Sequence, residues 1–278
     1  MNSIGNKRKF NLGYVSFISF IAALGGFLFG YDTAVISGTV SQVSEQFSLT
    51  TMQSGWYVGC ALVGSIIGVI FAGALSDRAG RKKTMILSAV LFTVSAAGCA
   101  ISMNLDQLVI YRIIGGMGIG VVSIVCPLYI SEVSPAKYRG RLVSLYQLAI
   151  TIGFLAAYLM NFVLLKQAEG FSSSILWLQK IFGTEVWRGM LGAETAPALL
   201  FLIVIFFIPE SPRWLIVQRK EETAKSIFSK IYNYKEDVLF EVKEVKSTLS
   251  HEEKSDWKLL LEPGIFRAVI IGVAIAIL

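Results

Sequence analysis

Six long apolar stretches, separated by short charged segments, dominate the sequence. Each is long enough to form a helix across the hydrocarbon core of a bilayer, which takes about 20 predominantly apolar residues. They lie near residues 12 to 38, 55 to 75, 84 to 103, 107 to 130, 142 to 164 and 187 to 208. The pattern predicts an all-α membrane protein with six transmembrane helices, surrounded by the lipid bilayer.

The C-terminal part of the chain has a different pattern. Between 209 and 262, Lys and Glu alternate with apolar residues such as Ile227 and Ile231 at a spacing typical of amphipathic surface helices. Pro263 and Gly264 interrupt this pattern, and the apolar run after them is too short to span a membrane. We therefore expect three parts: an N-terminal six-helix transmembrane bundle at 1–208, a cytoplasmic helical linker at 209–262, and the start of a truncated seventh transmembrane helix at 263–278.

Composition and charge agree with this assignment. The mean hydropathy is +0.64, and only 16% of the 278 residues are charged, which leaves more apolar surface than one soluble core can bury. The basic residues gather in 7–9, 78–83 and 137–141, whereas the alternate loops are poor in them. The positive-inside rule then places the N-terminus in the cytoplasm and the chain in the cell (cytoplasmic or inner) membrane. The net charge of +6 therefore requires no nucleic-acid partner.

The sequence contains no recognisable metal-binding or catalytic motif. Cys60, Cys99 and Cys126 are widely spaced within apolar runs, which predicts small buried side chains rather than disulfides or metal ligands. A phosphate-binding loop, a nucleophile elbow and paired carboxylates are all missing from the sequence. We expect no enzymatic activity, no metal and no cofactor.

Two ionisable residues fall inside the apolar stretches, where a charge is costly and indicates a functional site. Asp32 lies in the first stretch and Arg112 in the fourth. If these helices run outward and inward, both residues lie about 9 Å below the outer surface, so we expect them to pair. Two interpretations follow: a proton switch, in which loss of the arginine favours protonation of Asp32, or a static ion pair that holds two helices together.

Gln147, in the fifth stretch, is an uncharged group that both donates and accepts hydrogen bonds. It suits a ligand rich in hydroxyl groups, and it equally suits a hydrogen bond between two helices. A weak internal repeat adds to the picture, since Gly25-Gly26 and Gly115-Gly116 each lie near a charged residue. Two triplets of helices related by an inverted (3+3) repeat, with a binding site near the midplane, explain this repeat.

Several motifs together resemble one family. GALSDRAGRKKT at 73–84 is similar to the signature loop of the major facilitator superfamily, and the segments 112–153 and PESPRWL at 209–215 resemble signatures of its sugar porter family. GYDTAVISG at 30–38 is similar to the first helix of bacterial proton-xylose symporters. The chain thus resembles the N-terminal half of a bacterial proton-coupled monosaccharide symporter, which implies the major facilitator fold and a missing C-terminal six-helix half.

The resemblance also implies roles for individual residues. It makes Asp32 the proton-coupling carboxylate with Arg112 as its partner, Gln147 a ligand of sugar hydroxyls, and Phe29 an aromatic neighbour of the sugar. Phe154 departs from the xylose symporters, which have a second ligand glutamine there, and this departure argues against xylose. The resemblance further implies a salt-bridge network at the inner face that latches the two halves while the transporter opens outward, and interleaved acidic and basic residues favour this over ordinary solvated loop charge. Its members are Asp77, Arg78, Arg81, Glu132, Arg139, Glu210 and Arg213.

The expected function is secondary active transport of a monosaccharide with a proton, by alternating access between two six-helix halves. An uncoupled sugar facilitator is the nearest alternative, and Asp32 argues against it because a membrane carboxylate without a role is expensive. A membrane sugar sensor and a transport-inactive truncated product are the remaining alternatives.

Overall fold

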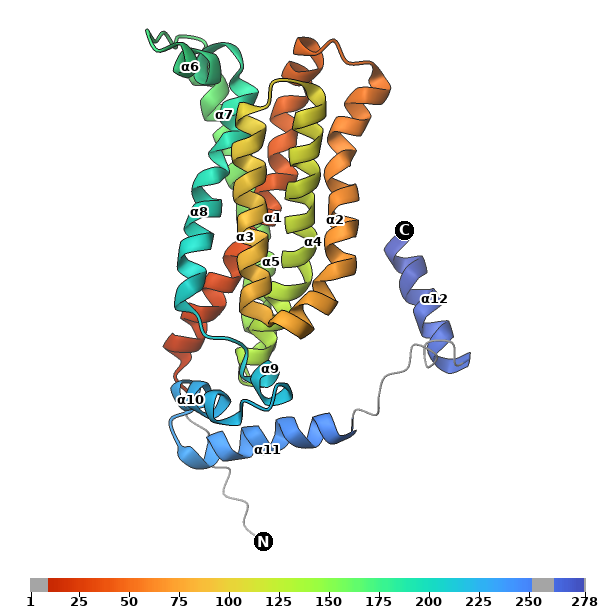
Figure 1. The fold of residues 1–278 in the computed structure, drawn as a ribbon, viewed down its shortest axis with the longest axis vertical. Coiled ribbons are helices and arrows are strands. Elements are labelled where there is room, and N and C mark those ends of the chain that lie inside the picture. The colour runs from red at the N-terminus through yellow and green to blue at the C-terminus, as the bar shows by residue number, and fades with distance from the viewer. Residues whose placement is uncertain (1–9, 252–262, 278) are drawn as a thin grey trace.

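The computed structural model of this protein describes residues 10–251 and 263–277, and the regular elements of the described part are all helices. Six membrane-length crossings run through it (Figure 1). Five are single helices: α1 (Leu12–Gln46), α2 (Thr51–Ala79), α3 (Arg81–Ile101), α4 (Leu105–Val133) and α5 (Arg139–Ala168). The sixth spans Val186–Phe207. The predicted all-α membrane fold with six crossings is therefore confirmed.

Most helices extend further than the apolar stretches predicted. The α1 helix continues beyond residue 38, where the first apolar stretch ends, to Gln46 through Ser41, Gln42 and other polar residues. Its 35 residues span about 52 Å, against a hydrocarbon core of about 30 Å. Hydropathy marks only the part of a helix that lies in hydrocarbon, and capping residues such as Thr50, before α2, set the actual helix ends.

The sixth crossing is broken, whereas the sequence predicted one continuous helix over 187–208. It consists of α7 (Val186–Ala193), α8 (Thr195–Val204) and a 3₁₀ turn, η2 (Ile205–Phe207), with Glu194 at the break. Pro197 explains the interruption, since it lacks a backbone N–H and its ring crowds the carbonyl of the preceding turn. The break leaves a carboxylate in the middle of the membrane.

Glycines bring two pairs of helices into backbone contact. A Cβ on Gly68 of α2 would lie 2.3 Å from the carbonyl oxygen of Met117 in α4, and one on Gly120 would lie 2.2 Å from that of Ser65. Gly30 of α1 approaches the Ile150 carbonyl of α5 in the same way, at 2.0 Å. The pairs α2–α4 and α1–α5 are equivalent in an inverted repeat of two helix triplets, as predicted.

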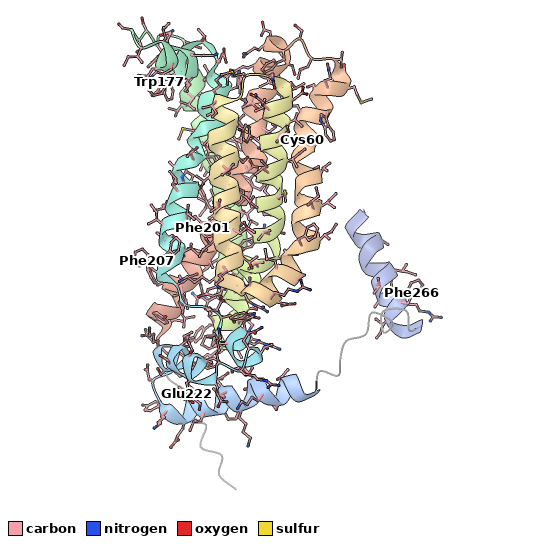
Figure 2. All side chains as sticks on the ribbon, in the orientation of Figure 1. Cys60, Trp177, Phe201, Phe207, Glu222 and Phe266 are labelled. Atoms are coloured by element: carbon pink, nitrogen blue, oxygen red, sulfur yellow. The ribbon has the colours of Figure 1, made fainter. Side chains whose placement is uncertain are left out.

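The outside of the bundle is apolar. Figure 2 shows Phe201 of α8 among the other helices and Phe207 on the outer surface; Phe207 is 73% exposed, whereas Phe201 is fully buried. Large apolar side chains also cover the outer faces of α2 and α5, including Ile66, Ile70 and Leu159. Only a surrounding bilayer covers so much apolar surface on a chain of this size.

Short helices lie at the two ends of the bundle (Figure 1). At one end are α9 (Pro212–Val217), α10 (Glu221–Ile231) and α11 (Lys235–His251), and the start of α1 is tied to them by the Asn11 N–H, which donates to the Ile231 carbonyl at 2.8 Å. At the other end are α6 (Leu176–Gln179) and a π-helical turn, η1 (Lys180–Thr184).

The segment expected to begin a seventh crossing forms α12 (Pro263–Ile277), which lies apart from the bundle in Figure 1. The basic segment 7–9 and the linker residues 252–262 lie outside the described residues.

Candidate functional site

Asp32 and Arg112 form a buried ion pair in the interior of the bundle. The Arg112 Nη1 donates to Asp32 Oδ1 at 2.5 Å, and each side chain is 2% exposed. The second carboxylate oxygen of Asp32 and the Nε of Arg112 have no hydrogen-bond partner among the described residues. The hydrogen-bonding groups of this ion pair are therefore only partly satisfied, although a buried charge usually needs every available hydrogen-bond partner.

The local sequence explains how α1 and α4 bring these side chains together. Gly115, one turn from Arg112, leaves room at the contact, because a Cβ there would lie 2.5 Å from Ser95 Oγ and 3.6 Å from Asp32 Oδ1. Gly25 lies against the Cys126 side chain, on the same interface nearer to α10. The glycines let the two helices approach each other closely enough for a direct ion pair.

A third ionisable side chain, Glu194, lies beside this pair. It is 2% exposed, it interacts electrostatically with Asp32 and Arg112, and its Oε1 has no hydrogen-bond partner within the described part of the chain. The sequence reasoning missed this residue, although the signal was present: Glu194 is an acidic residue within an apolar run predicted to cross the membrane. The site thus contains two buried carboxylates and one arginine.

The residues predicted to contact a sugar lie on α1 and α5, which are in backbone contact. Phe29 is half-buried, and it lies one position from Gly30, which touches the Ile150 carbonyl. Gln147 is exposed, one turn nearer to α10. Its side-chain amide makes no hydrogen bond within residues 10–251 and 263–277, so the structure does not show the alternative hydrogen bond between helices. Phe154 is half-buried against the apolar core.

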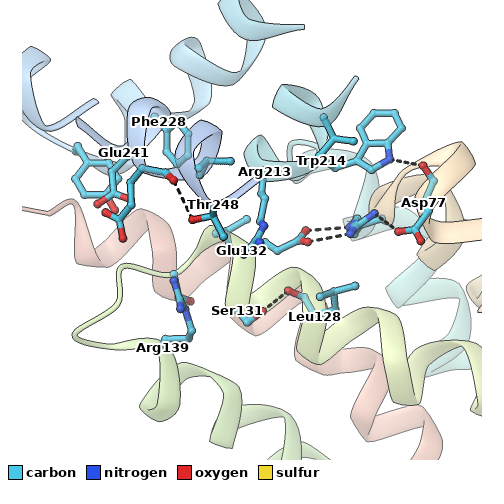
Figure 3. A pocket seen from close by; sticks show the side chains of 17 residues that line it. Asp77, Leu128, Ser131, Glu132, Arg139, Arg213, Trp214, Phe228, Glu241 and Thr248 are labelled. Carbon is cyan, nitrogen blue, oxygen red and sulfur yellow. Dashed lines mark hydrogen bonds and ion pairs between the residues drawn. The ribbon is translucent and has the colours of Figure 1, made fainter. Parts of the chain in front are cut away.

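A charged cluster lies at the α10 end of the bundle, around a cavity of about 830 Å³ (Figure 3). Arg81, at the start of α3, forms a two-point ion pair with Glu132 of α4 at 2.9 and 3.0 Å. Its remaining nitrogen contacts Asp77 at 3.1 Å and the Ser76 carbonyl at 3.0 Å. Two-point arginine–carboxylate pairs fix geometry as well as charge. Here the pair joins the α2–α3 turn to α4.

The other charged residues predicted for this cluster have different roles in the structure. Glu210 caps the first turn of α3, accepting from the backbone N–H groups of Arg81 at 2.9 Å and Lys82 at 3.1 Å. Arg213 lines the cavity. Arg78 and Arg139 are exposed, and neither forms an ion pair with another described residue.

Residues suited to holding a metal do not gather in the described structure, where no group of three or more His, Cys, Asp or Glu side chains comes together. The three cysteines are buried free thiols, and Figure 2 shows Cys60 on the α2 side of the bundle. Buried carboxylates are groups that can bind and release protons, and the exposed Gln147 amide is a group that can hydrogen-bond a neutral polar ligand.

Comparison with known proteins gives a consistent result. A family model described as "Sugar (and other) transporter" matches residues 18–278. The chain is 43% identical to the glucose transport protein of Synechocystis over 270 residues. The matched region covers 96% of this chain and 56% of that protein. It is 39% identical to the D-xylose-proton symporter of Escherichia coli, over 97% of this chain and 58% of that protein.

Solved structures agree with the sequence matches. The structure of the major facilitator proton:xylose symporter XylE, bound to 6-bromo-6-deoxy-D-glucose, superposes with a TM-score of 0.80 at 39% identity, over 90% of this chain and 56% of that one. The chain spans a little more than half the length of the curated relatives that it matches.

Proposed function

We propose, from the premise that this chain belongs to the sugar transporter family of the major facilitator superfamily, that it is the N-terminal half of a proton-coupled monosaccharide symporter. Members of this family are transporters rather than enzymes. In this proposal the sugar crosses the membrane by alternating access, as two six-helix halves move around a site near the midplane.

The buried group of Asp32, Arg112 and Glu194 carries the proposal. One arginine balances one carboxylate, so the second carboxylate leaves a surplus negative charge in a region of low dielectric constant. A bound proton removes that surplus. Movement of Arg112 away from Asp32 leaves Asp32 in need of a proton as well, and this links the charge state of the site to the packing of α1 against α4.

The substrate side of the proposal rests on Gln147 and Phe29. Gln147 offers an exposed, unpaired amide within a membrane crossing, and Phe29 adds an apolar ring on the neighbouring helix. An amide and an aromatic ring on neighbouring helices suit a sugar, which has hydroxyl groups at its edge and apolar faces. The names of relatives cover glucose, arabinose and xylose, so we propose a pentose or hexose.

The direction of insertion completes the proposal. The basic segments 78–83 and 137–141 lie at the same end of the bundle as α10 and α11 (Figure 1). We therefore propose that this end faces the cytoplasm, with the chain in the cell membrane and its N-terminus inside. The cluster around Arg81 and Glu132 then lies on the cytoplasmic face, where it is available to contact a second six-helix half.

The test uses a joined transporter, in which this chain is followed by the second half of the xylose-proton symporter. We expect Asp32→Asn in that protein to abolish proton-driven accumulation of sugar and to retain exchange of sugar across the membrane. The asparagine keeps the size of the side chain and cannot titrate. The measurement is labelled-sugar uptake and counterflow in proteoliposomes with an imposed proton gradient.

Glu45→Gln is the matched control, because Glu45 is also a carboxylate of α1 and lies in its last turn. It should leave accumulation unchanged, and the unmutated joined transporter must itself accumulate sugar. Accumulation by the Asp32→Asn variant would contradict the coupling role. Downhill transport that ignores the proton gradient in the unmutated protein would instead establish an uncoupled facilitator.

A further inference from the structure

An apolar groove of about 400 Å³ opens on the outside of the bundle between α1, α5 and α8. Its walls include Phe20, Leu24 and Phe27 of α1, Leu148 and Ile152 of α5, and Leu200 of α8. The volume falls within the range of pockets that hold small ligands, about 300–1,000 Å³. A cavity lined by such side chains offers water no partners, so its occupant is apolar.

The broken sixth crossing accounts for the groove. The segment before the break at Glu194, α7, packs against α3, α1 and α5, whereas α8 packs against α3 and α1 alone among these three helices. Pro197, in the first turn of α8, itself lines the groove. Meanwhile α5 is held on α1 by backbone contacts at Gly26 and Gly30. The departure of α8 from α5 therefore leaves an open space with α1 as its floor.

The groove begins in one leaflet of the membrane and reaches its middle. Phe20 and Phe27 are about 12 and 22 Å from the α10 end of α1, counted along the helix axis. The α1 helix crosses a hydrocarbon core of about 30 Å and extends beyond it. The groove therefore lies at the depth of acyl chains, from the leaflet on the side of α10 and α11 to the region of the bilayer midplane.

The polar residues of the same helices indicate which face meets lipid. Thr33 on α1 and Gln147 and Thr151 on α5 are exposed polar side chains within the crossings, and such residues avoid hydrocarbon. On α5, Leu148 and Ile152 each follow Gln147 and Thr151 by one residue, so their side chains lie about 100° further around the helix axis. The groove thus lies on a face that carries apolar side chains alone, next to the face that carries the polar ones.

We propose that this groove binds one acyl chain of a membrane phospholipid from the leaflet on the α10 side. The phenylalanine rings and the leucines enclose the chain laterally, and the position of α8 against α3 keeps the groove open. The bound chain replaces the packing that α8 would otherwise make with α5. Its site is separate from the buried carboxylates and from Gln147.

Crosslinking to a photoreactive lipid tests this proposal on the full chain. The protein is reconstituted in phosphatidylcholine nanodiscs that contain a small fraction of phosphatidylcholine with a diazirine in the middle of its acyl chain, illuminated, and mapped by mass spectrometry. We expect adducts on Leu24, Ala149 and Leu200 to exceed those on Val94 several-fold. Val94 is an exposed apolar residue of α3 that faces outward without a groove.

Two filling variants separate binding from general lipid contact. Ala149→Phe and Leu200→Phe each place a ring in the groove, and we expect either to reduce groove adducts several-fold while adducts on Val94 remain. Ala97→Phe is the matched control, because Ala97 is an exposed alanine of α3. Equal labelling of the groove and Val94 in the unmutated protein would overturn the proposal, as would enriched labelling that both well-folded variants leave unchanged. Circular dichroism and gel filtration establish that the variants are folded.

Discussion

At the scale of single residues, the buried carboxylates determine what this bundle can respond to. Asp32 and Glu194 share one arginine, and each has an oxygen without a hydrogen-bond partner in the described structure. The depth of Asp32 and Arg112, counted along their helices, was enough to predict that they pair. Glu194 was not predicted as part of the site, because the apolar character of residues 187–208 predicted one uniform transmembrane helix.

Gln147→Ala in the joined transporter should weaken sugar binding roughly three- to tenfold, because a hydrogen bond of this kind contributes about 0.5–1.5 kcal/mol. Isothermal titration calorimetry with glucose and with xylose measures the loss. Gln167→Ala provides the control, since Gln167 is an exposed glutamine near the far end of the same helix. Unchanged affinity in a well-folded Gln147→Ala variant would remove Gln147 from the site.

At the scale of helices, the hydrophobic pattern predicted the number of crossings and the position of their apolar parts. It did not predict where helices end, because Thr50 and Asn104 cap their helices through side-chain oxygens that hydropathy does not report. It also did not predict the break between α7 and α8. The glycine spacing was informative, since Gly64 and Gly68 lie against the Ile113 and Met117 carbonyls.

The start of α7 provides a pH prediction. Burial raises the pKa of Glu185, but its hydrogen bond to Arg188 and its pairing with Lys180, at 3.3 Å, lower it by more, so the pKa lies below its ordinary value of 4.5. The stabilisation is therefore present above pH 4.5 and is lost as the pH falls through the lowered value. Arg188 also donates to the Ala100 carbonyl at 3.2 Å, which ties α7 to α3.

We therefore expect hydrogen exchange in 186–193 to speed up several-fold relative to α4 as the pH falls below 4.5 and through the lowered pKa of Glu185, after correction for the intrinsic rate. Glu185→Gln should show the faster exchange already at pH 7 and lose the pH step. Glu169→Gln, which changes an exposed carboxylate at the end of α5, should retain it. A pH step that persists in Glu185→Gln would assign the effect to another group.

At the scale of the whole molecule, the helices bond their own backbone groups, and Thr33, Gln147 and Thr151 are polar crossing residues that face outward. Transmembrane helices need no partner to insert, so we expect the 278-residue chain to enter the membrane by itself. Alternating access needs two bodies that move against each other. We therefore expect the chain alone to transport no sugar, and the chain with a co-expressed second half of a related porter to do so.

Labelled-sugar uptake in liposomes measures this difference, with empty liposomes and the second half alone as controls. Membrane insertion is checked separately by resistance to alkaline extraction. Saturable uptake by the 278-residue chain alone would contradict the expectation and would indicate that two copies form one pathway.

The glycine contacts between helices have a mechanical consequence. Where a backbone rests directly on a backbone, as at Gly68 and Gly30, no side chains lie between the helices to change rotamer, so α2–α4 and α1–α5 behave as two stiff plates. The plates meet where α1 faces α4, through side chains such as Cys126 and Val122. That joint is the more compliant part of the bundle, and Asp32 and Arg112 lie across it. In the proposed mechanism, a proton bound there changes the contact across this joint, and a small displacement near the joint becomes a larger one at the far edges of the two plates.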